Sequence, residues 1–259
     1  MRRALVTGAG TRLGRAMALH LAGRGLDVAV HYGASEGPAE AVAAEIRAMG
    51  RRAATLRADL ADEAEAAALL PAAAEALGGP IECLINSAAV FEPDTIRDAT
   101  REGWDAHFAV NLRAPYLLIQ AMAAQGLEPA PGADGEPVAA GLAVNMIDQK
   151  VWKLTPGFST YTLSKSALWT LTQTAAQALA PAIRVNAIGP GPTLRAARQS
   201  EEHFARQRAA LPLGRGADEG DVCAALGYLL DARAVTGQMI CPDGGQHLAW
   251  RTPDILGPG

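Results

Sequence analysis

Short apolar runs alternate with longer helix-like stretches along the whole chain, and this alternation most constrains the fold. The apolar runs fall at residues 4–6, 27–31, 53–57, 81–86, 142–147, 183–188 and 238–241. Strands that are apolar throughout and are separated by helices form parallel sheets covered on both faces, with right-handed crossovers. We therefore predict an α/β fold with a doubly wound sheet of about seven parallel strands and helices on both faces.

One segment breaks the pattern. Residues 126–141, GLEPAPGADGEPVAAG, are rich in proline, glycine and acidic residues, which predicts a surface loop. Because predicted strands continue on both sides of it, we place no domain boundary there. A length of 259 residues suits one large α/β domain, so the prediction is a single domain over 1–259.

Net charge and composition limit the kinds of molecule that the protein can be expected to bind. The formal net charge is −4 and no basic run stands out, which argues against nucleic-acid binding. No uncharged apolar stretch reaches the roughly 18 residues of a membrane span, and a strand-like run follows the N-terminus too closely for a signal peptide. Three cysteines lie far apart without metal-type spacing, which favours small buried thiols, no metal site and a cytoplasmic protein.

A glycine-rich turn, residues 7–14 (TGAGTRLG), follows the first predicted strand and opens the first predicted helix. Gly8 and Gly10 would let the backbone approach a pyrophosphate, and Gly14 would let the helix pack closely on the strand. The helix N-terminus would then face the anion. This order predicts a Rossmann-like dinucleotide site, although an ordinary tight turn has a similar composition.

The end of the second predicted strand indicates which dinucleotide binds. Proteins that bind NAD usually carry an acidic residue there, whereas this chain has His31, Tyr32 and Ser35 with no acid until Glu36. Arg12 and Ser35 could together hold a 2′-phosphate, so we predict NADP(H). The alternative for Arg12 is a turn residue that faces solvent.

Two further strand ends carry candidate cofactor contacts. Asp59 could accept a hydrogen bond from adenine or cap the next helix, a role for which Asp62 competes. Asn86, Ser87 and Ala88 end the fourth predicted strand, at the carboxyl edge where open sheets bind ligands, or they simply form a turn.

Tyr161 and Lys165 lie four residues apart on a predicted amphipathic helix, and therefore on one helical face. A phenol ionises near pH 10, and a nearby ammonium lowers that pKa. The pair therefore predicts a general acid/base, although an exposed tyrosine and lysine would show the same spacing.

These motifs resemble those of the short-chain dehydrogenase/reductases over nearly the full length. The matching segments are TGAGTRLG, ADL (58–60), INSAA (85–89), Asn111 in VNLRAP, YTLSK (161–165), RVNAIGPG (184–191) and TGQMICPDGG (236–245). The resemblance implies that Lys165 holds the nicotinamide ribose and lowers the pKa of Tyr161, which relays a proton during hydride transfer. It also implies that Asn111 holds a water linked to Lys165, whereas the alternative is an asparagine bonded to backbone.

Three departures from the family pattern resemble pteridine reductases and dihydromonapterin or dihydrofolate reductases. Arg12 replaces the usual middle glycine, Asp148 replaces the usual serine, and Phe91 follows the fourth-strand motif. In that subgroup the arginine lies near the cofactor phosphates and the pterin, the phenylalanine stacks on the pterin, and the aspartate joins the tyrosine and lysine. A carboxylate repels a developing alkoxide and suits protonation of a ring nitrogen, so we expect burial to raise the pKa of Asp148. The alternatives are core packing for Phe91 and a solvated loop aspartate for Asp148.

Pattern and resemblance together predict one set of site residues. Cofactor contacts are expected from Gly8, Gly10, Arg12, Leu13, Gly14, His31, Tyr32, Ser35, Asp59, Leu60, Asn86, Ser87, Ala88, Lys165, Pro190, Gly191 and Thr193. Catalytic residues are expected to be Tyr161, Lys165, Asp148 and Asn111, and substrate contacts Arg12, Phe91, Asp148 and Tyr161. The segment of about 193–215 resembles a mobile substrate lid or is a plain solvated helix, and related proteins imply a homotetramer.

The predicted function is NADPH-dependent reduction of a flat heterocycle such as a dihydropterin or a dihydrofolate-like compound. Two alternatives remain open, namely a generic carbonyl or 3-oxoacyl-thioester reductase and a dinucleotide-binding protein without turnover.

Overall fold

Seven strands form one parallel sheet in the computed structural model, which describes residues 1–250. They are β1 (Arg3–Val6), β2 (Asp27–Tyr32), β3 (Ala53–Arg57), β4 (Cys83–Asn86), β7 (Gly141–Met146), β8 (Ile183–Ile188) and β9 (Met239–Ile240). Their order across the sheet is β3-β2-β1-β4-β7-β8-β9. The predicted doubly wound α/β sheet is therefore confirmed. The final stretch of the predicted domain, 251–259, lies outside the described residues.

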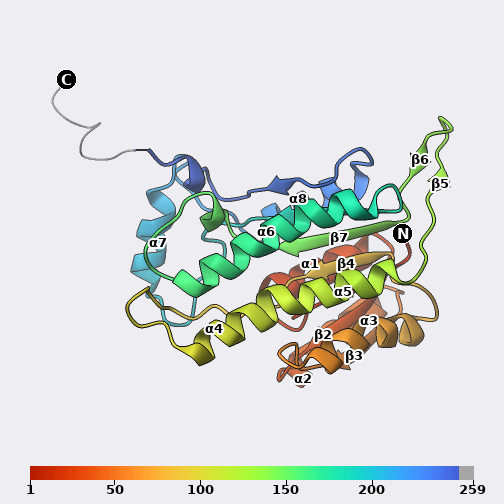
Figure 1. The fold of residues 1–259 in the computed structure, drawn as a ribbon, viewed down its shortest axis with the longest axis horizontal. Coiled ribbons are helices and arrows are strands. Elements are labelled where there is room, and N and C mark those ends of the chain that lie inside the picture. Colours follow the sequence, from red (N-terminus) through yellow and green to blue (C-terminus); the bar gives the residue numbers. More distant parts are fainter. Residues whose placement is uncertain (251–259) are drawn as a thin grey trace.

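Helices cover both faces of this sheet (Figure 1). They are α1 (Arg12–Gly23), α2 (Glu36–Ala48), α3 (Glu63–Leu77), α4 (Arg101–Phe108), α5 (Ala114–Ala123), α6 (Ser159–Leu179), α7 (Glu201–Ala209) and α8 (Glu219–Asp231). Successive strand residues point to opposite faces. Val28 and Val30 pack with α1, α2 and α8, whereas Ala29 packs with α3, α5 and α6.

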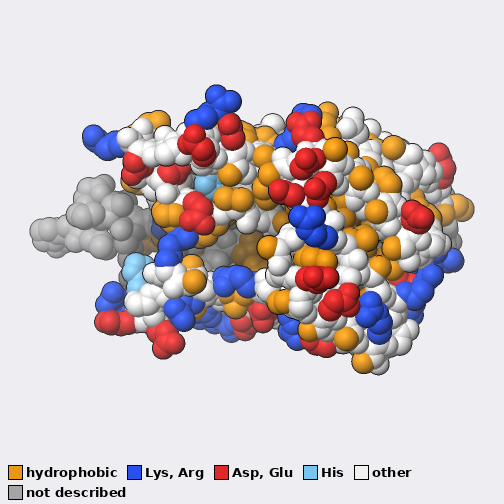
Figure 2. All heavy atoms as spheres, turned by 90° about the horizontal axis from the view of Figure 1, so that it is seen from below, with side chains coloured by type: hydrophobic (Ala, Val, Ile, Leu, Met, Phe, Trp, Pro, Cys, Tyr) orange, Lys and Arg blue, Asp and Glu red, His pale blue; other side chains and the backbone are white. Residues whose placement is uncertain are grey.

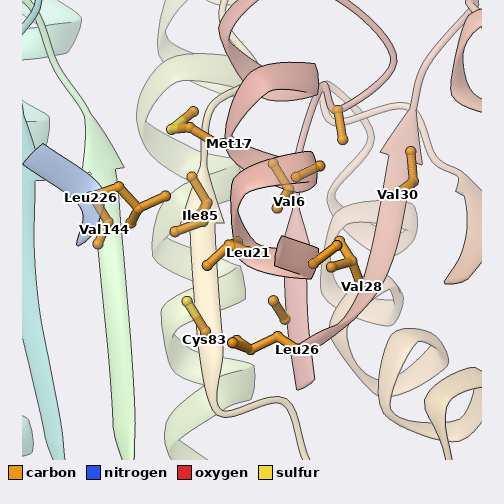
Figure 3. Close-up of a cluster of buried hydrophobic side chains, with 14 of the residues drawn as sticks. Val6, Met17, Leu21, Leu26, Val28, Val30, Cys83, Ile85, Val144 and Leu226 are labelled. Carbon is orange, nitrogen blue, oxygen red and sulfur yellow. The ribbon is translucent and has the colours of Figure 1, made fainter. Parts of the chain in front are cut away.

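The core on the first of these faces explains why the strands are apolar throughout. Figure 3 shows Val6, Val28 and Ile85 from three neighbouring strands meeting Met17 and Leu21 of α1. All five side chains are fully buried. Because the opposite face is buried in the same way, the alternation of polar and apolar residues seen in half-exposed strands is absent here.

Two regions differ from the sequence-based expectation. Within 126–141 the chain forms a two-stranded antiparallel ribbon, β5 (Ala130–Pro131) and β6 (Pro137–Val138), which projects from the molecule in Figure 1. Its turn is closed where Gly132 donates to the carbonyl of Glu136, and Gly135 takes a φ of +82° that suits glycine. In the second region two helices, α4 and α5, follow each other between successive strands of the sheet and are joined without a loop by a π-helical turn, Ala109–Arg113.

The topology creates a crevice at one end of the sheet. Strand order reverses between β1 and β4, so the connections from these two strands leave in opposite directions. In Figure 1 the segment around α7 lies at the end where α6 begins, and the ribbon β5–β6 lies at the opposite end. No helix within residues 1–250 is both long and apolar enough to cross a bilayer.

Candidate active site

A cleft of about 1030 Å³ opens at the carboxyl ends of β1, β4, β7 and β8. Figure 2 shows a face of the molecule with a hollow in it and with Lys and Arg side chains close to that hollow. The predicted site residues that line the cleft are Gly8, Arg12, Leu13, Gly14, Ser87, Ala88, Phe91, Asp148, Tyr161, Lys165, Pro190, Gly191 and Thr193. Those that do not are Gly10, His31, Tyr32, Ser35, Asp59, Leu60, Asn86 and Asn111.

The glycine turn leaves bare backbone at the floor of the cleft. Gly8 has a φ of +64°, and a Cβ added there would lie 3.1 Å from Cα of Ala88. A Cβ on Gly14 would lie 2.2 Å from the carbonyl oxygen of Gly8, so α1 packs against the turn only because this residue is glycine. This cradle fits the pyrophosphate of a dinucleotide, which needs close backbone approach and a helix N-terminus.

Thr7 fixes the distance between the two strands that border the crevice. Its buried hydroxyl oxygen accepts hydrogen bonds from the backbone N–H groups of Ser87 at 2.9 Å and of Ala88 at 3.0 Å. The end of β1 is thereby fastened to the end of β4. Thr7 was not among the predicted site residues, although its hydroxyl directly after a buried strand was an available signal.

His31 braces the glycine turn from inside the protein. Its Nδ1 accepts a hydrogen bond from the N–H of Gly8 at 3.1 Å, so Nε2 carries the proton and donates to the carbonyl of Ala58 at 3.1 Å. Burial lowers the pKa of His31, which favours this neutral form. The ring does not line the cleft and positions the glycine turn from within, and the expected cofactor contact of His31 stays a prediction.

Arg12 reaches a different partner from the expected one. Its guanidinium donates to the carbonyls of Arg195 at 3.0 Å and Leu194 at 3.1 Å, in the segment after β8. The expected contact of Arg12 and Ser35 with a 2′-phosphate stays a prediction. Arg12 has a φ of +51°, in the left-handed region, which accounts for the glycine that the family usually has at this position.

The residues at the ends of β2 and β3 lie beyond the cleft. Asp62, not Asp59, caps α3, because its carboxylate accepts from the N–H groups of Ala64 and Glu65. Asp59 instead accepts from the N–H of Ala61 at 2.9 Å. The expected adenine contact of Asp59 stays a prediction, as do the contacts of the neighbouring residues Leu60, Tyr32 and Ser35.

Asp148 and Tyr161 form the polar centre of the cleft. The Tyr161 hydroxyl donates to Oδ2 of Asp148 at 3.1 Å, and the backbone N–H of Lys150 donates to Oδ1 at 2.8 Å. Burial raises the pKa of Asp148, as expected from the sequence. Burial also raises the pKa of Tyr161 well above its ordinary value, and the charge of Asp148 adds to this.

The expected lowering of the Tyr161 pKa by Lys165 is not seen, because burial and the charge of Asp148 raise that pKa. The Lys165 ammonium donates to the carbonyl of Met146 at 2.7 Å and lies 5.8 Å from the centroid of the Tyr161 ring. The nearest charged neighbour of the phenol is instead the Asp148 carboxylate. Lys165 is itself buried, and burial lowers its pKa to about 8.

Asn111 connects the two walls of the cleft from behind. It lies in the π-helical turn, and its amide exchanges hydrogen bonds with the N–H and carbonyl of Val90 at 2.8 and 2.9 Å. The same amide donates to the hydroxyl of Ser164 at 3.1 Å. The side chain thus makes the backbone bonds weighed as the alternative, while its link to Lys165 through a water stays a prediction.

Phe91 belongs to an aromatic cluster rather than to the core. It is 39% exposed and stacks on Phe158 with a centroid distance of 4.6 Å. Its ring also meets the edge of Tyr161, again at 4.6 Å. The plate expected beside the reaction centre is therefore made of two rings, held next to the phenol that would supply the proton.

Asp94 connects this cluster to the start of α6. Its carboxylate accepts from both the N–H and the hydroxyl of Thr160, and its carbonyl accepts from the N–H of Phe158 at 2.7 Å. Phe158, which precedes α6, has a φ of +61° and gives the helix no side-chain cap. Asp94 supplies that cap from a distant part of the chain, which sequence spacing alone cannot reveal.

The segment expected to act as a lid contains α7, which buries none of its residues. Arg208 anchors it, because its guanidinium donates to the carbonyls of Pro192 at 2.7 Å, Ala217 at 2.5 Å and Gly216 at 2.9 Å. The basic residues Arg198 and Lys150, which were not among the predicted site residues, also line the cleft. Residues 1–250 contain no group of His, Cys, Asp and Glu side chains suited to a metal ion.

Comparison with known proteins agrees with this geometry. A family model described as enoyl-(acyl carrier protein) reductase matches residues 8–247. The 3-oxoacyl-(acyl-carrier-protein) reductase FabG of Staphylococcus aureus is 30% identical over 250 residues, which cover 95% of this chain and 98% of the relative.

Two solved structures are similar over nearly the whole chain. FolM alternative dihydrofolate reductase 1 from Brucella suis, in complex with NADP, is 45% identical, covers 98% of both chains and superposes with a TM-score of 0.89. A short chain dehydrogenase from Burkholderia cenocepacia, also in complex with NADP, is 32% identical over 96% of this chain and 98% of its own, with a TM-score of 0.85.

Fold, glycine cradle and buried tyrosine–aspartate pair together define an oxidoreductase built on a dinucleotide-binding sheet. The chain belongs to the short-chain dehydrogenase/reductase family.

Proposed function

We propose that the chain is an NADPH-dependent reductase of a dihydropterin or a dihydrofolate-like substrate. The observation that carries the proposal is the hydrogen bond from the Tyr161 hydroxyl to Asp148 at 3.1 Å, beside the exposed ring of Phe91. A flat heterocycle suits an aromatic plate, and a protonated carboxyl suits a ring nitrogen that must gain a proton.

The cofactor assignment rests on the cradle and on the relatives. Gly8 and Gly14 provide the close backbone approach, and β2 ends at Tyr32 without an acidic residue. The FolM and Burkholderia structures were both obtained with NADP. When bound, NADPH supplies the hydride; Lys165 is then placed to orient its ribose and Asn111 to hold a water near that lysine.

The residues of this chain then supply the proton. Tyr161 donates its proton to the ring nitrogen as the adjacent carbon receives the hydride, and protonated Asp148 replaces it through their hydrogen bond. Burial raises the pKa of both groups, so both retain their protons nearer neutral pH. Phe91 holds the ring in the plane that this transfer requires.

A carbonyl or 3-oxoacyl-thioester reductase is the second candidate, favoured by the FabG relatives at 30% identity. Asp148 and Phe91 argue against it, because the serine that the family usually has at position 148 to steady the carbonyl oxygen is missing. A dinucleotide-binding protein without turnover is the third, and the assembled Tyr161, Asp148 and Lys165 argue against it.

A substrate panel tests the proposal. NADPH oxidation by the purified protein is followed with dihydrobiopterin, dihydromonapterin, dihydrofolate, simple ketones and acetoacetyl thioesters, and then with NADH. We expect turnover of the dihydropterins or dihydrofolate with NADPH. Turnover of acetoacetyl thioesters alone would replace the proposal with the second candidate, and tight NADPH binding without any turnover would replace it with the third.

We further propose a homotetramer in the cytoplasm. The helices α4, α5 and α6 leave Trp104, Tyr116 and Leu163 between 42% and 48% exposed, which suits contact with further copies of the chain. Light scattering after size exclusion tests this, and a monomer at micromolar concentration would contradict it. The cytoplasmic location rests on the unpaired cysteines Cys83, Cys223 and Cys241.

A further inference from the structure

Two basic side chains flank the aromatic cluster of the cleft. The guanidinium carbon of Arg198 lies 4.7 Å from the centroid of Phe91 and 5.1 Å from that of Phe158. The Lys150 ammonium lies 5.5 Å from the centroid of Phe158. Because Phe91 and Phe158 stack on each other, both cations lie at the same end of the cleft.

Neither cation is neutralised by the protein. Within residues 1–250, no carboxylate forms an ion pair with Lys150 or Arg198. Their hydrogen bonds go to neutral groups, namely the hydroxyl of Thr155 for Lys150 and the carbonyl of Phe91 for Arg198, at 3.1 Å in the second case. Asp148 is the one acidic residue that lines the described cleft, and the Tyr161 hydroxyl already donates to it.

The proposed chemistry leaves these two charges unused. The glycine turn serves the cofactor phosphates, and proton transfer runs through Tyr161 and Asp148. Lys150 and Arg198 stand beside the ring-binding plate instead, in a protein whose net charge is −4. Positive charge retained in a cleft of an acidic protein attracts an anion and raises its local concentration.

We infer that Lys150 and Arg198 form a subsite for an anionic tail of the substrate, a carboxylate or a phosphate attached to the ring that stacks on Phe91. The inference rests on the proposed function and adds to it a preference for substrates with an anionic tail. Substrates such as dihydropteroate and dihydrofolate, with one and two carboxylates, are preferred over dihydrobiopterin, whose side chain is neutral.

The test is a ratio of specificity constants measured with saturating NADPH. We compare kcat/KM for dihydropteroate, dihydrofolate and dihydroneopterin monophosphate with kcat/KM for dihydrobiopterin in the wild type, Lys150→Met and Arg198→Met. Each variant should lower the ratio for the anionic substrates about fivefold to tenfold, the size of a lost charge-assisted contact. Lys150→Arg keeps the positive charge and should retain most of the preference for the anionic substrates.

Lys153→Met is the matched control, because Lys153 lies in the same segment but does not line the cleft. It should leave the ratio unchanged. Dissociation constants of folate and biopterin for the NADP⁺ complex give a second readout without turnover. There, Lys150→Met and Arg198→Met should weaken folate binding relative to biopterin binding by a similar factor.

The outcomes separate the two proposals. A fall for the carboxylate substrates only, for the phosphate only, or for both supports the subsite and identifies the anion that it accepts. Reduction of these substrates with unchanged ratios and unchanged relative binding overturns the subsite while the reductase proposal stands. Failure to reduce or bind any of them overturns the reductase proposal, and the subsite with it.

Discussion

Replacing Lys165 by methionine should stabilise the protein at neutral pH while abolishing turnover. Lys165 is 2% exposed, and its ammonium has one hydrogen-bonded partner, the carbonyl of Met146. Methionine has a similar length and no charge, so it can occupy the same space. The variant therefore separates the cost of burying an ammonium from the catalytic benefit of having one.

The magnitude follows from the pKa. Burial lowers the pKa of Lys165 from its ordinary 10.5 to about 8. At about 1.4 kcal/mol for each pH unit, this corresponds to about 3 kcal/mol of destabilisation when the lysine is charged in both states. Loss of the hydrogen bond to Met146 destabilises the variant by about 1 kcal/mol, so the expected net gain in unfolding free energy is about 2 kcal/mol, or a rise in Tm of about 4–8 °C.

The sign of the pH dependence is fixed by linkage. Between pH 8 and 10.5 the unfolded chain holds the Lys165 proton and the folded chain has released it, so wild-type stability rises with pH. The advantage of Lys165→Met should therefore be full below pH 8 and should shrink towards pH 10.

Denaturant unfolding of wild type and variant at pH 7 and pH 9.5 measures this, with Lys153→Met as a control expected to change stability by less than about 0.5 kcal/mol. A variant that is less stable than the wild type at pH 7, or an advantage that does not shrink at pH 9.5, would refute the argument that the buried charge is costly.

Asp148→Asn should lower kcat for a dihydropterin about a hundredfold or more and leave NADPH affinity unchanged. In the wild type kcat should fall as pH rises through the raised pKa of Asp148; this fall should be absent in the variant, and its persistence would exclude Asp148 as the proton source. Thr7→Val should cost about 1–3 kcal/mol and weaken NADPH binding, because it leaves the N–H of Ala88 without an acceptor and that of Ser87 with only the carbonyl of Ile85. The exposed Thr170→Val is the control, and equal effects would contradict the role of Thr7. Asp94→Ala should cost about 1 kcal/mol of stability and raise KM for the heterocycle, because it removes the cap of α6. The control Asp98→Ala breaks only hydrogen bonds within its own loop and should do neither; identical KM values for the two variants would show that the cap does not position the aromatic cluster.

The parallel, doubly wound sheet followed from the sequence because each strand is apolar on both faces, and only a parallel sheet covered on both sides uses such strands. The glycine turn was predicted from its place after the first strand, Tyr161 from its spacing to Lys165, and Asp148 and Phe91 from the family resemblance. The raised pKa of Asp148 followed from its expected burial.

Side-chain direction was not predictable in the same way. His31 was expected to face the cofactor and instead turns inward, because Gly8 and Ala58 offer it a donor and an acceptor on two other segments. Arg12 bonds carbonyls that lie about 180 residues further along the chain. Lys165 and Tyr161 share a helical face as expected, but spacing could not show that Met146 holds the ammonium.

The attachment of α7 has a consequence for how this protein changes over generations. The hydrogen bonds of Arg208 go only to main-chain oxygens, which every amino acid possesses, and α7, which carries Arg208, has no buried residue. His203, which is exposed and borders the cleft, can therefore be replaced without destabilising the fold. New substrate preferences can therefore evolve at the rim of the cleft while Tyr161 and Asp148 beneath it stay unchanged.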